Sequence, residues 1–324
     1  MNKEQLLIGD IGGTNARFAL IKTGSNRYSD EEILQCKDFA GPIEAIQEYL
    51  RRSGNSKPEA ICLAVAGPVR NGNVCLTNNH WQVQTSELID FFKIEHVKLL
   101  NDFEAIAYSL PVLSGEEFKV IGEIVTPSFT NSNLTVGVVG PGTGLGAAAL
   151  LKRDGRLHAL VTEAGHVGFA PENSMQLEML KILQKEFGHV SDEQLLSGPG
   201  LENIYKALAK IKDIFAEPLS AAEIFESGNS NQVAVSSIEM FLQILGQVVG
   251  NFVLSTGAFD GVYIGGGMMQ RYPERLSSSA FRTAFENKGC HKEIMEKIPT
   301  ILITHSHPGL LGAGCVANSM LKQN

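Results

Sequence analysis

Apolar residues recur along this chain in two patterns: short runs that end at glycine or polar residues, and longer stretches with the three-four spacing of a helix face. The short runs predict β-strands and the longer spaced stretches predict α-helices, which together indicate an α/β protein. The first two runs flank a glycine turn and predict a β-hairpin, and the later runs predict buried strands. The runs that predict strands are 6–9, 16–21, 60–66, 96–100, 261–264 and 299–304.

Helical spacing is clearest at residues 233–254, where it predicts a core helix. Its apolar face consists of Val233, Ile238, Phe241, Ile244, Leu245, Val248, Val249 and Phe252. We expect Thr85 and Ser220 to cap two further helices, because each precedes an acid in the first turn. The other expected helices are 42–52, 85–92, 103–110, 174–187, 200–212, 218–225 and one from 308.

Residues 134–151 carry no charge, so their length raises the question of a membrane span. Five glycines and a proline divide the stretch, however, and predict a strand, a glycine turn and a second strand in a protein core. Residues 115–133, rich in Ser, Thr and Gly, predict a loose connection, with a lobe boundary near Leu113.

Composition sets limits on size and partners. A chain of 324 residues that is 44% apolar can bury one large core or two modest ones, and we expect two lobes. Its 27 Lys and Arg stand against 35 Asp and Glu, a net charge of -8, with no basic cluster. A nucleic-acid partner is therefore not expected, because phosphates demand a concentrated cationic surface.

The five cysteines are scattered and lack zinc-ligand spacing, so we expect reduced thiols in a cytosolic protein. Acids and glycines occupy the first 13 residues, where an export signal needs an unbroken apolar stretch. The sequence thus predicts a cytoplasmic location.

The turn at residues 9–17 places an acid, two adjacent glycines and a hydroxyl between two strands. Backbone N–H groups and the Thr14 hydroxyl could converge there on an anion. A carboxylate beside a phosphate is repulsive without a cation, so Asp10 implies Mg²⁺ held through water. An ordinary hairpin with an Asx turn is the alternative.

A second turn at 140–146 repeats this design around Thr143, and a third glycine cluster lies at 264–268. Two such turns suggest two sides of one phosphate-binding site. The chain has neither a P-loop nor a dinucleotide fingerprint. Taken alone, the third cluster could equally be a simple turn.

Three glycine turns in this order resemble the phosphate-one, phosphate-two and adenosine motifs of hexokinase, actin and chaperone ATPases. Four further stretches resemble the bacterial glucokinase family: LLNDFEAIA, TEAGHVGFAP, GHVSDEQLLSGPGL and HPGLLGAG. The resemblance runs from about residue 7 to residue 314. Ala164 stands where relatives usually carry glycine, and the zinc motif CxCGxxGCxE of another sugar-kinase branch is absent, so no structural zinc is expected.

This resemblance implies an actin-like ATPase (ribonuclease H-like) α/β fold with two lobes around a central cleft. The expected lobes are 1–112 with 305–324, and 113–304. It also implies a homodimer that uses MgATP and glucose. The implied nucleotide contacts are Gly9, Asp10, Ile11, Gly12, Gly13, Thr14, Gly142, Thr143, Gly144, Gly265 and Gly266. The implied glucose contacts are Asn101, Asp102, Glu163, His166 and Glu193.

A sugar hydroxyl needs an acceptor for its proton, and Asp102, at a strand end, is the expected general base. Its alternative role is a helix N-cap. Glu163 and Glu193 can accept hydrogen bonds from sugar hydroxyls, while His166 and Asn101 can donate them. Glu193 could instead be a solvated helix residue and His166 a core histidine.

Three rival functions stay open on the sequence. The nearest is a kinase for fructose, mannose or an N-acetylated amino sugar. A chaperone-like or filament-forming ATPase would need added subdomains, for which 324 residues leave little room. A sugar-sensing regulator would usually carry a helix-turn-helix domain before the first glycine hairpin, and only eight residues precede Gly9 here.

Overall fold

The computed structural model describes residues 5–55, 57–76, 79–123, 126–227 and 230–321. The chain divides into two compact units, residues 1–115 with 307–324 and residues 116–306. The sequence predicts the divisions after residues 112 and 304.

The first unit is built on a five-stranded sheet in the order β3-β2-β1-β4-β7. The three strands β1, β4 and β7 are parallel, whereas β2 and β3 are antiparallel additions at one edge. A separate two-stranded sheet pairs β5 (Asn73–Cys75) with β6 (Gln82–Gln84). The main strands are β1 (Gln5–Ile11), β2 (Asn15–Lys22), β3 (Tyr28–Gln35), β4 (Ala60–Val65) and β7 (His96–Asn101).

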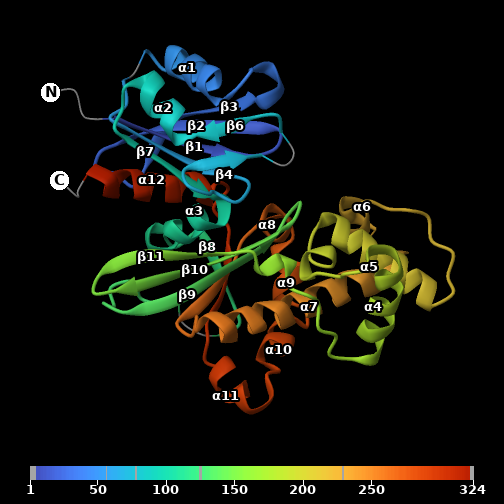
Figure 1. Ribbon diagram of the computed structural model, residues 1–324. Helices are drawn as coiled ribbons and strands as arrows, with labels where there is room; N and C mark the ends of the chain where they lie inside the picture. Colours follow the sequence, from blue (N-terminus) through green and yellow to red (C-terminus); the bar gives the residue numbers. More distant parts are fainter. Residues whose placement is uncertain (1–4, 56, 77–78, 124–125, 228–229, 322–324) are drawn as a thin grey trace. The chain divides into compact units, whose positions relative to one another are not determined.

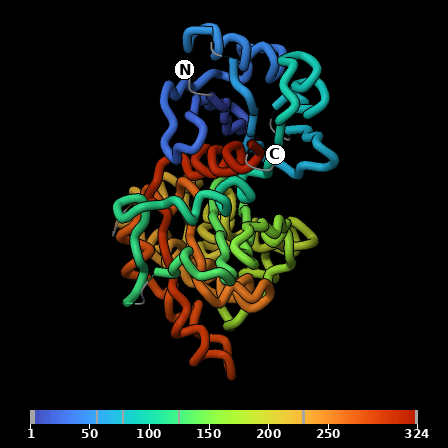
Figure 2. The backbone as a smooth tube through the Cα atoms, turned by 90° about the vertical axis from the view of Figure 1, so that its left-hand side faces the viewer, coloured from blue at the N-terminus to red at the C-terminus, as the bar shows by residue number. Residues whose placement is uncertain are grey.

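Helices cover both faces of this sheet, which explains why β4 is continuously apolar and why residues 6–8 of β1 are all apolar. One face packs on α1 (Pro42–Arg52) and α2 (Thr85–Phe92), with Leu7 and Tyr49 in that core. The other face packs on α3 (Asp102–Ser109) and α12 (Pro308–Met320), with Leu6, Ile8 and Leu310 in that core. The last helix of the chain thus lies against the first strand (Figure 2).

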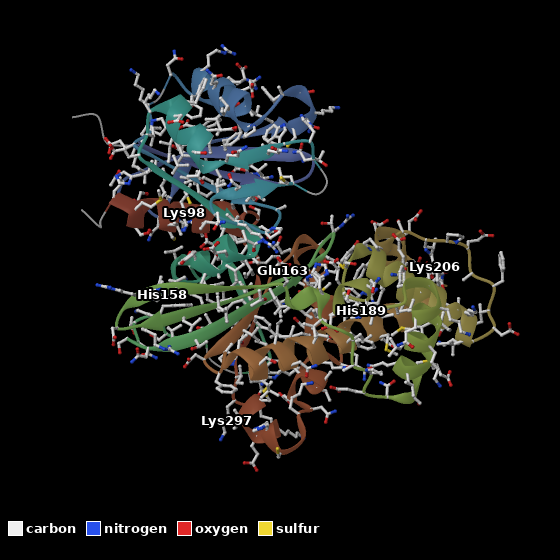
Figure 3. All side chains as sticks on the ribbon, in the orientation of Figure 1. Lys98, His158, Glu163, His189, Lys206 and Lys297 are labelled. Carbon is white, nitrogen blue, oxygen red and sulfur yellow. The ribbon has the colours of Figure 1, made fainter. Side chains whose placement is uncertain are left out.

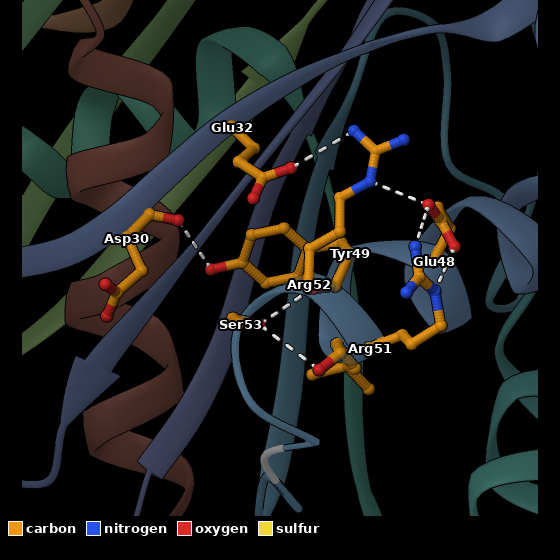
Figure 4. Close-up of polar contacts among 8 residues, drawn as sticks. Asp30, Glu32, Glu48, Tyr49, Arg51, Arg52 and Ser53 are labelled. Atoms are coloured by element: carbon orange, nitrogen blue, oxygen red, sulfur yellow. Dashed lines mark hydrogen bonds and ion pairs between the residues drawn. The ribbon is translucent and has the colours of Figure 1, made fainter.

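The edge strand β3 is mostly exposed and acidic, and side chains of α1 fasten it (Figure 4). The buried Tyr49 donates its hydroxyl to the Asp30 carbonyl at 2.8 Å. Arg52 lies 3.5 Å from the Glu32 carboxylate and also binds Glu48 within its own helix. The strand is therefore held by polar contacts, which a hydrophobic pattern does not reveal.

The second unit contains a six-stranded sheet in the order β11-β10-β9-β12-β13-β8 (Figure 1). Here β12 runs parallel to both β9 and β13, and β8 is antiparallel at the edge. The strands are β8 (Phe118–Ile121), β9 (Leu134–Pro141), β10 (Leu145–Arg153), β11 (Arg156–Thr162), β12 (Gly261–Ile264) and β13 (Thr300–Ile303).

Helices form the rest of the second unit, and the longest, α7, lies in its core. By length and composition α7 could cross a membrane, but 72% of its most apolar window is buried inside the protein, as in a core helix. The helices are α4 (Ser174–Phe187), α5 (Gly198–Ile211), α6 (Ala221–Glu226), α7 (Gln232–Thr256), α8 (Gly267–Arg271), α9 (Pro273–Ser277), α10 (Phe281–Glu286) and α11 (Lys292–Met295).

Two local predictions are wrong. The stretch 115–133 contains the edge strand β8, although its residues 124–125 lie outside the described residues. Thr85 does not cap α2; it is the first helical residue and donates its hydroxyl to the Gly72 carbonyl at 2.9 Å. Ser220 does cap α6, because its hydroxyl accepts the N–H of Glu223 as predicted.

Candidate active site

In the first unit, polar side chains gather where parallel strands end. Ile11, Val65 and Asn101 are in register at the carboxyl ends of β1, β4 and β7. Asp10 therefore lies on the same edge as Asn101 and Asp102. Ligand sites of α/β proteins commonly lie at such an edge.

Asn101, rather than Asp102, caps α3. Its side-chain oxygen accepts the N–H groups of Phe103 and Glu104, and Glu104 in return accepts the Asn101 N–H. The Asn101 amide also donates to the Gly67 carbonyl at 3.1 Å. The N-cap alternative for Asp102 is therefore wrong, and Asn101 fixes the backbone that presents Asp102.

The Asp102 carboxyl is a weak acid for an aspartate. Burial raises its pKa to about 6, and the nearby Asp10 charge adds to the rise, while the Phe103 N–H opposes it. Such a carboxylate is ionised at neutral pH yet accepts a proton more readily than a solvated aspartate, which suits a general base.

Asp10 lies beside the start of α12. Burial raises the pKa of its carboxyl, and the charge of Arg17 on the paired strand opposes that rise. A Cβ added at Gly309 would lie 3.4 Å from the Asp10 carboxylate, so glycine allows the first turn of α12 to come close. The positive end of that helix favours a negative charge there.

The first glycine turn uses part of its hydrogen-bonding capacity internally. The Gly12 N–H donates to the Asn15 carbonyl at 2.9 Å, and the Thr14 carbonyl accepts the Cys36 N–H at 2.9 Å. The Gly12 N–H is therefore not a bare donor for an anion, contrary to expectation. A Cβ at Gly9 would lie 2.7 Å from Leu63, so packing alone explains that glycine.

In the second unit, the structure brings Glu163, His166 and Glu193 together. Glu163 follows β11 (Figure 3), His166 ends the next short turn, and Glu193 lies before α5. His166 Nε2 is 3.9 Å from Glu163 Oε2, and His166 Nδ1 is 3.9 Å from Glu193 Oε1. His166 is exposed, so it is not a core histidine, and two carboxylates and an imidazole can bind several hydroxyl groups.

The second glycine turn joins β9 to β10 and meets this cluster. The Gly142 N–H donates to the Gly144 carbonyl at 2.8 Å, which leaves Thr143 exposed at the tip. The Leu145 N–H donates to Glu193 Oε2 at 2.8 Å. Glu193 lies in a single turn of 3-10 helix (Asp192–Gln194), but its carboxylate binds the glycine turn and is not a free, solvated group, contrary to its alternative reading.

The third glycine cluster packs directly against the second. The Gly265 N–H donates to the Val139 carbonyl at 2.9 Å, and a Cβ at Gly140 would lie 2.6 Å from the Gly265 carbonyl carbon. Gly266 has φ 85° and a backbone contact with Pro141, so a side chain would be strained there. The second and third turns thus form one continuous backbone surface.

The stretch LSGPG, residues 196–200, has a role that the sequence alone does not indicate. The Ser197 hydroxyl donates to the Glu193 carbonyl at 2.8 Å and accepts the Gly200 N–H, so Ser197 caps α5. The Gly198 N–H donates to the Gly142 carbonyl at 2.9 Å. A serine directly before a glycine-proline helix start was the available signal.

Known proteins resemble this chain in sequence and in fold. The family model described as Glucokinase matches residues 7–320. A glucokinase of Marinobacter nauticus is 39% identical over 311 residues, which cover 95% of each chain. The crystal structure of a glucokinase from an Antarctic psychrotroph is 35% identical, with a TM-score of 0.89 over 98% of this chain and 99% of that one.

A more distant structure has the same fold. The glucokinase of the ROK family from Streptomyces griseus, solved with glucose and AMPPNP, is 17% identical and has a TM-score of 0.65 over 97% of this chain and 99% of that one. The fold of this chain is therefore the actin-like ATPase fold of sugar kinases. With a family model over nearly its whole length and close full-length relatives, the chain belongs to the glucokinase family.

Proposed function

We propose that this chain transfers the γ-phosphoryl group of ATP to the 6-hydroxyl of glucose. Its membership of the glucokinase family supports this reaction. The observation that carries the residue assignment is Asp102, a partly buried carboxyl at the carboxyl edge of parallel strands, whose pKa desolvation raises to about 6. Both substrates are also named for the distant structure with glucose and AMPPNP.

In this reaction the sugar oxygen attacks the γ-phosphorus, and the bond from that phosphorus to the bridging oxygen of ADP breaks. The Asp102 carboxylate accepts the hydroxyl proton. Glu163 and Glu193 accept hydrogen bonds from other hydroxyl groups, and His166 donates one. Asn101 acts chiefly by holding the first turn of α3, because both ends of its amide bind backbone groups.

The glycine residues of the three turns are proposed to contact the nucleotide, with Thr143 at the exposed tip of the second turn. A divalent cation fits the first unit, because Asp10 and Asp102 are two carboxyls whose charges disfavour each other. Asp10 would hold Mg²⁺ through water. Such an ion offsets phosphate charge when bound. We also propose that the protein is cytoplasmic and that it forms a homodimer.

The test is turnover by Asp102→Ala, with glucose, mannose, fructose and N-acetylglucosamine offered separately. We expect glucose to be the best substrate of the wild type, and the variant to lose about 10²-fold or more of kcat. Nucleotide binding and folding should persist, as measured by calorimetry and circular dichroism. Near-normal turnover by the variant would remove Asp102 from the base role.

A better rate with another hexose would instead favour the rival sugar kinases. ATP hydrolysis that does not depend on any sugar would favour the rival ATPase function. Equal turnover with and without Mg²⁺ would contradict the role proposed for Asp10.

A further inference from the structure

The carboxylate of Glu193 faces two different groups with its two oxygens. Oε2 accepts the Leu145 N–H at 2.8 Å, at the end of the second glycine turn. Oε1 lies on the side of His166, whose Nδ1 is 3.9 Å away. Oε2 is therefore committed to the turn, and the Glu193 side chain as a whole is 32% exposed.

The contact between Glu193 and the turn is closely fitted. A Cβ on Gly144 would overlap the Glu193 carboxylate, so a side chain at position 144 excludes this arrangement. Burial of Ser197 and its bond to the Glu193 carbonyl fix the backbone that carries the carboxylate.

The segment 193–198 also binds the other end of the turn. The Gly198 N–H donates to the Gly142 carbonyl at 2.9 Å, and the Gly142 N–H closes the turn onto Gly144. Residues 193–198 therefore hold the turn at both Gly142 and Leu145. Of these bonds, the one to Glu193 has a charged acceptor, and bonds to charged groups are stronger than neutral ones.

We propose that Glu193 is a positioning residue for the nucleotide as well as a sugar ligand. It holds residues 142–145 in their phosphate-binding shape through Oε2, and it receives the sugar through Oε1. The proposal rests on the proposed function, since it takes this turn as a phosphate site. Because one carboxylate serves both substrates, binding of either changes the affinity for the other by the same factor.

Glu163 provides a matched control within the same cluster. It is also a carboxylate assigned to the sugar, and it lies 3.9 Å from His166 on the opposite ring nitrogen. Its side chain is 62% exposed, and among the described residues it makes no hydrogen bond to the glycine turn. Loss of Glu163 should therefore affect sugar binding alone.

The experiment measures the Kd of AMP-PNP with Mg²⁺ by calorimetry in the absence of any sugar. We expect Glu193→Ala to weaken nucleotide binding about tenfold, because the Leu145 N–H loses a charged acceptor. Glu163→Ala should stay within about twofold of wild type. Glu193→Gln should recover most of the nucleotide affinity, because its amide oxygen can accept the same N–H, while glucose binding stays weak.

Equal nucleotide affinity for Glu193→Ala and wild type would overturn the proposal, and so would an equal loss in Glu163→Ala. If Glu193→Ala fails to fold, Glu193→Gln provides the test. The proposal assigns Oε2 to the turn and Oε1 to the sugar, so it would be contradicted if Glu193→Gln bound both ligands normally or lost affinity for both. No sugar is present in the nucleotide measurement. A failure of glucose as substrate would therefore leave the nucleotide result standing and would count against the proposed function only.

Discussion

At the scale of single residues, the environment of Asp102 suits a general base but lowers the stability of the folded protein when the carboxyl is ionised. Its neighbours Asn101 and Glu104 satisfy the free N–H groups of the helix start, so Asp102 is not needed as a cap. Burial instead raises its pKa to about 6, which means that the fold disfavours its ionised form. A residue kept for stability alone would not be placed in this way.

Replacing Asp102 with asparagine should therefore stabilise the protein while abolishing most activity. The folded pKa of about 6 exceeds the ordinary 3.8, so the native state binds more protons than the unfolded state between those values. Stability of the wild type should rise as pH falls from about 6 to 4. We expect Asp102→Asn to raise the free energy of unfolding by roughly 1–3 kcal/mol at pH 7.5, with a smaller gain at pH 4.

Urea denaturation at the two pH values, without Mg²⁺ or substrates, measures this difference. Asp90→Asn is a suitable control, because Asp90 lies on α2 away from the strand ends. A wild type more stable than Asp102→Asn at pH 7.5 would contradict the assigned pKa direction.

At the scale of elements, the first unit depends on two glycines of α12 that face different neighbours. A Cβ at Gly312 would overlap the carbonyl of Ala105 in α3, and one at Gly314 would lie 3.0 Å from Ile21 in β2. These two glycines let α12 lie close to the helix that begins at Asp102 and to the sheet. The spacing of α12 and α3 thus bears on where Asp102 is presented.

Gly312→Ala should consequently weaken both folding and turnover. Alanine is the better helix former, but its methyl group would push α3 away, and overpacking of this kind costs about 1–3 kcal/mol. Thermal unfolding and kcat with glucose measure the two effects. Ser319→Ala on the exposed side of the same helix is the control, and it should change neither by much.

Comparing the elements shows which helices and strands can be predicted from the sequence. Apolar spacing predicted α1 with the observed bounds, because this helix buries one continuous face. The predicted bounds of α2 and α4 also match the structure, although Thr85 does not cap α2 as expected. The search for apolar runs missed β3 and β11, because most of their residues are exposed or only half-buried. Glycine spacing predicted three turns, but their backbone groups bind partners far along the chain: the Cys36 N–H donates to the Thr14 carbonyl, and Glu193 accepts the Leu145 N–H.

The proposed roles of the site residues came from resemblance, and they stay predictions. The contact of Glu193 with the second turn could not be foreseen, because 48 residues separate it from Leu145. The sequence around either residue does not predict this contact. It follows from the pairing of β9 with β10 and from the cap of α5 at Ser197.

At the scale of the whole molecule, the chain has two units with separate cores, and each unit carries some of the residues that we propose to bind ligands. Asp10 and Asp102 belong to the first unit, whereas Glu163, His166 and Glu193 belong to the second. A ligand that binds only the native chain stabilises it by mass action, whichever unit supplies the contacts.

Thermal unfolding across a panel of hexoses should therefore rank the sugars. Glucose at 100 times its Kd should add about 2.7 kcal/mol to the free energy of unfolding. A sugar that is not bound should add nothing at the same concentration, and galactose serves as the control. A larger shift with another hexose than with glucose would point to that hexose as the substrate.

The position of α12 has a consequence for synthesis on the ribosome. The first strands to emerge belong to a unit whose other face is closed by residues 308–320. Residues 116–306 can pack their own core as soon as they are made, since domains fold as units. The earlier-made sheet therefore lacks the cover of α12 over Leu6, Ile8 and Cys62 until residues 308–320 have been synthesised.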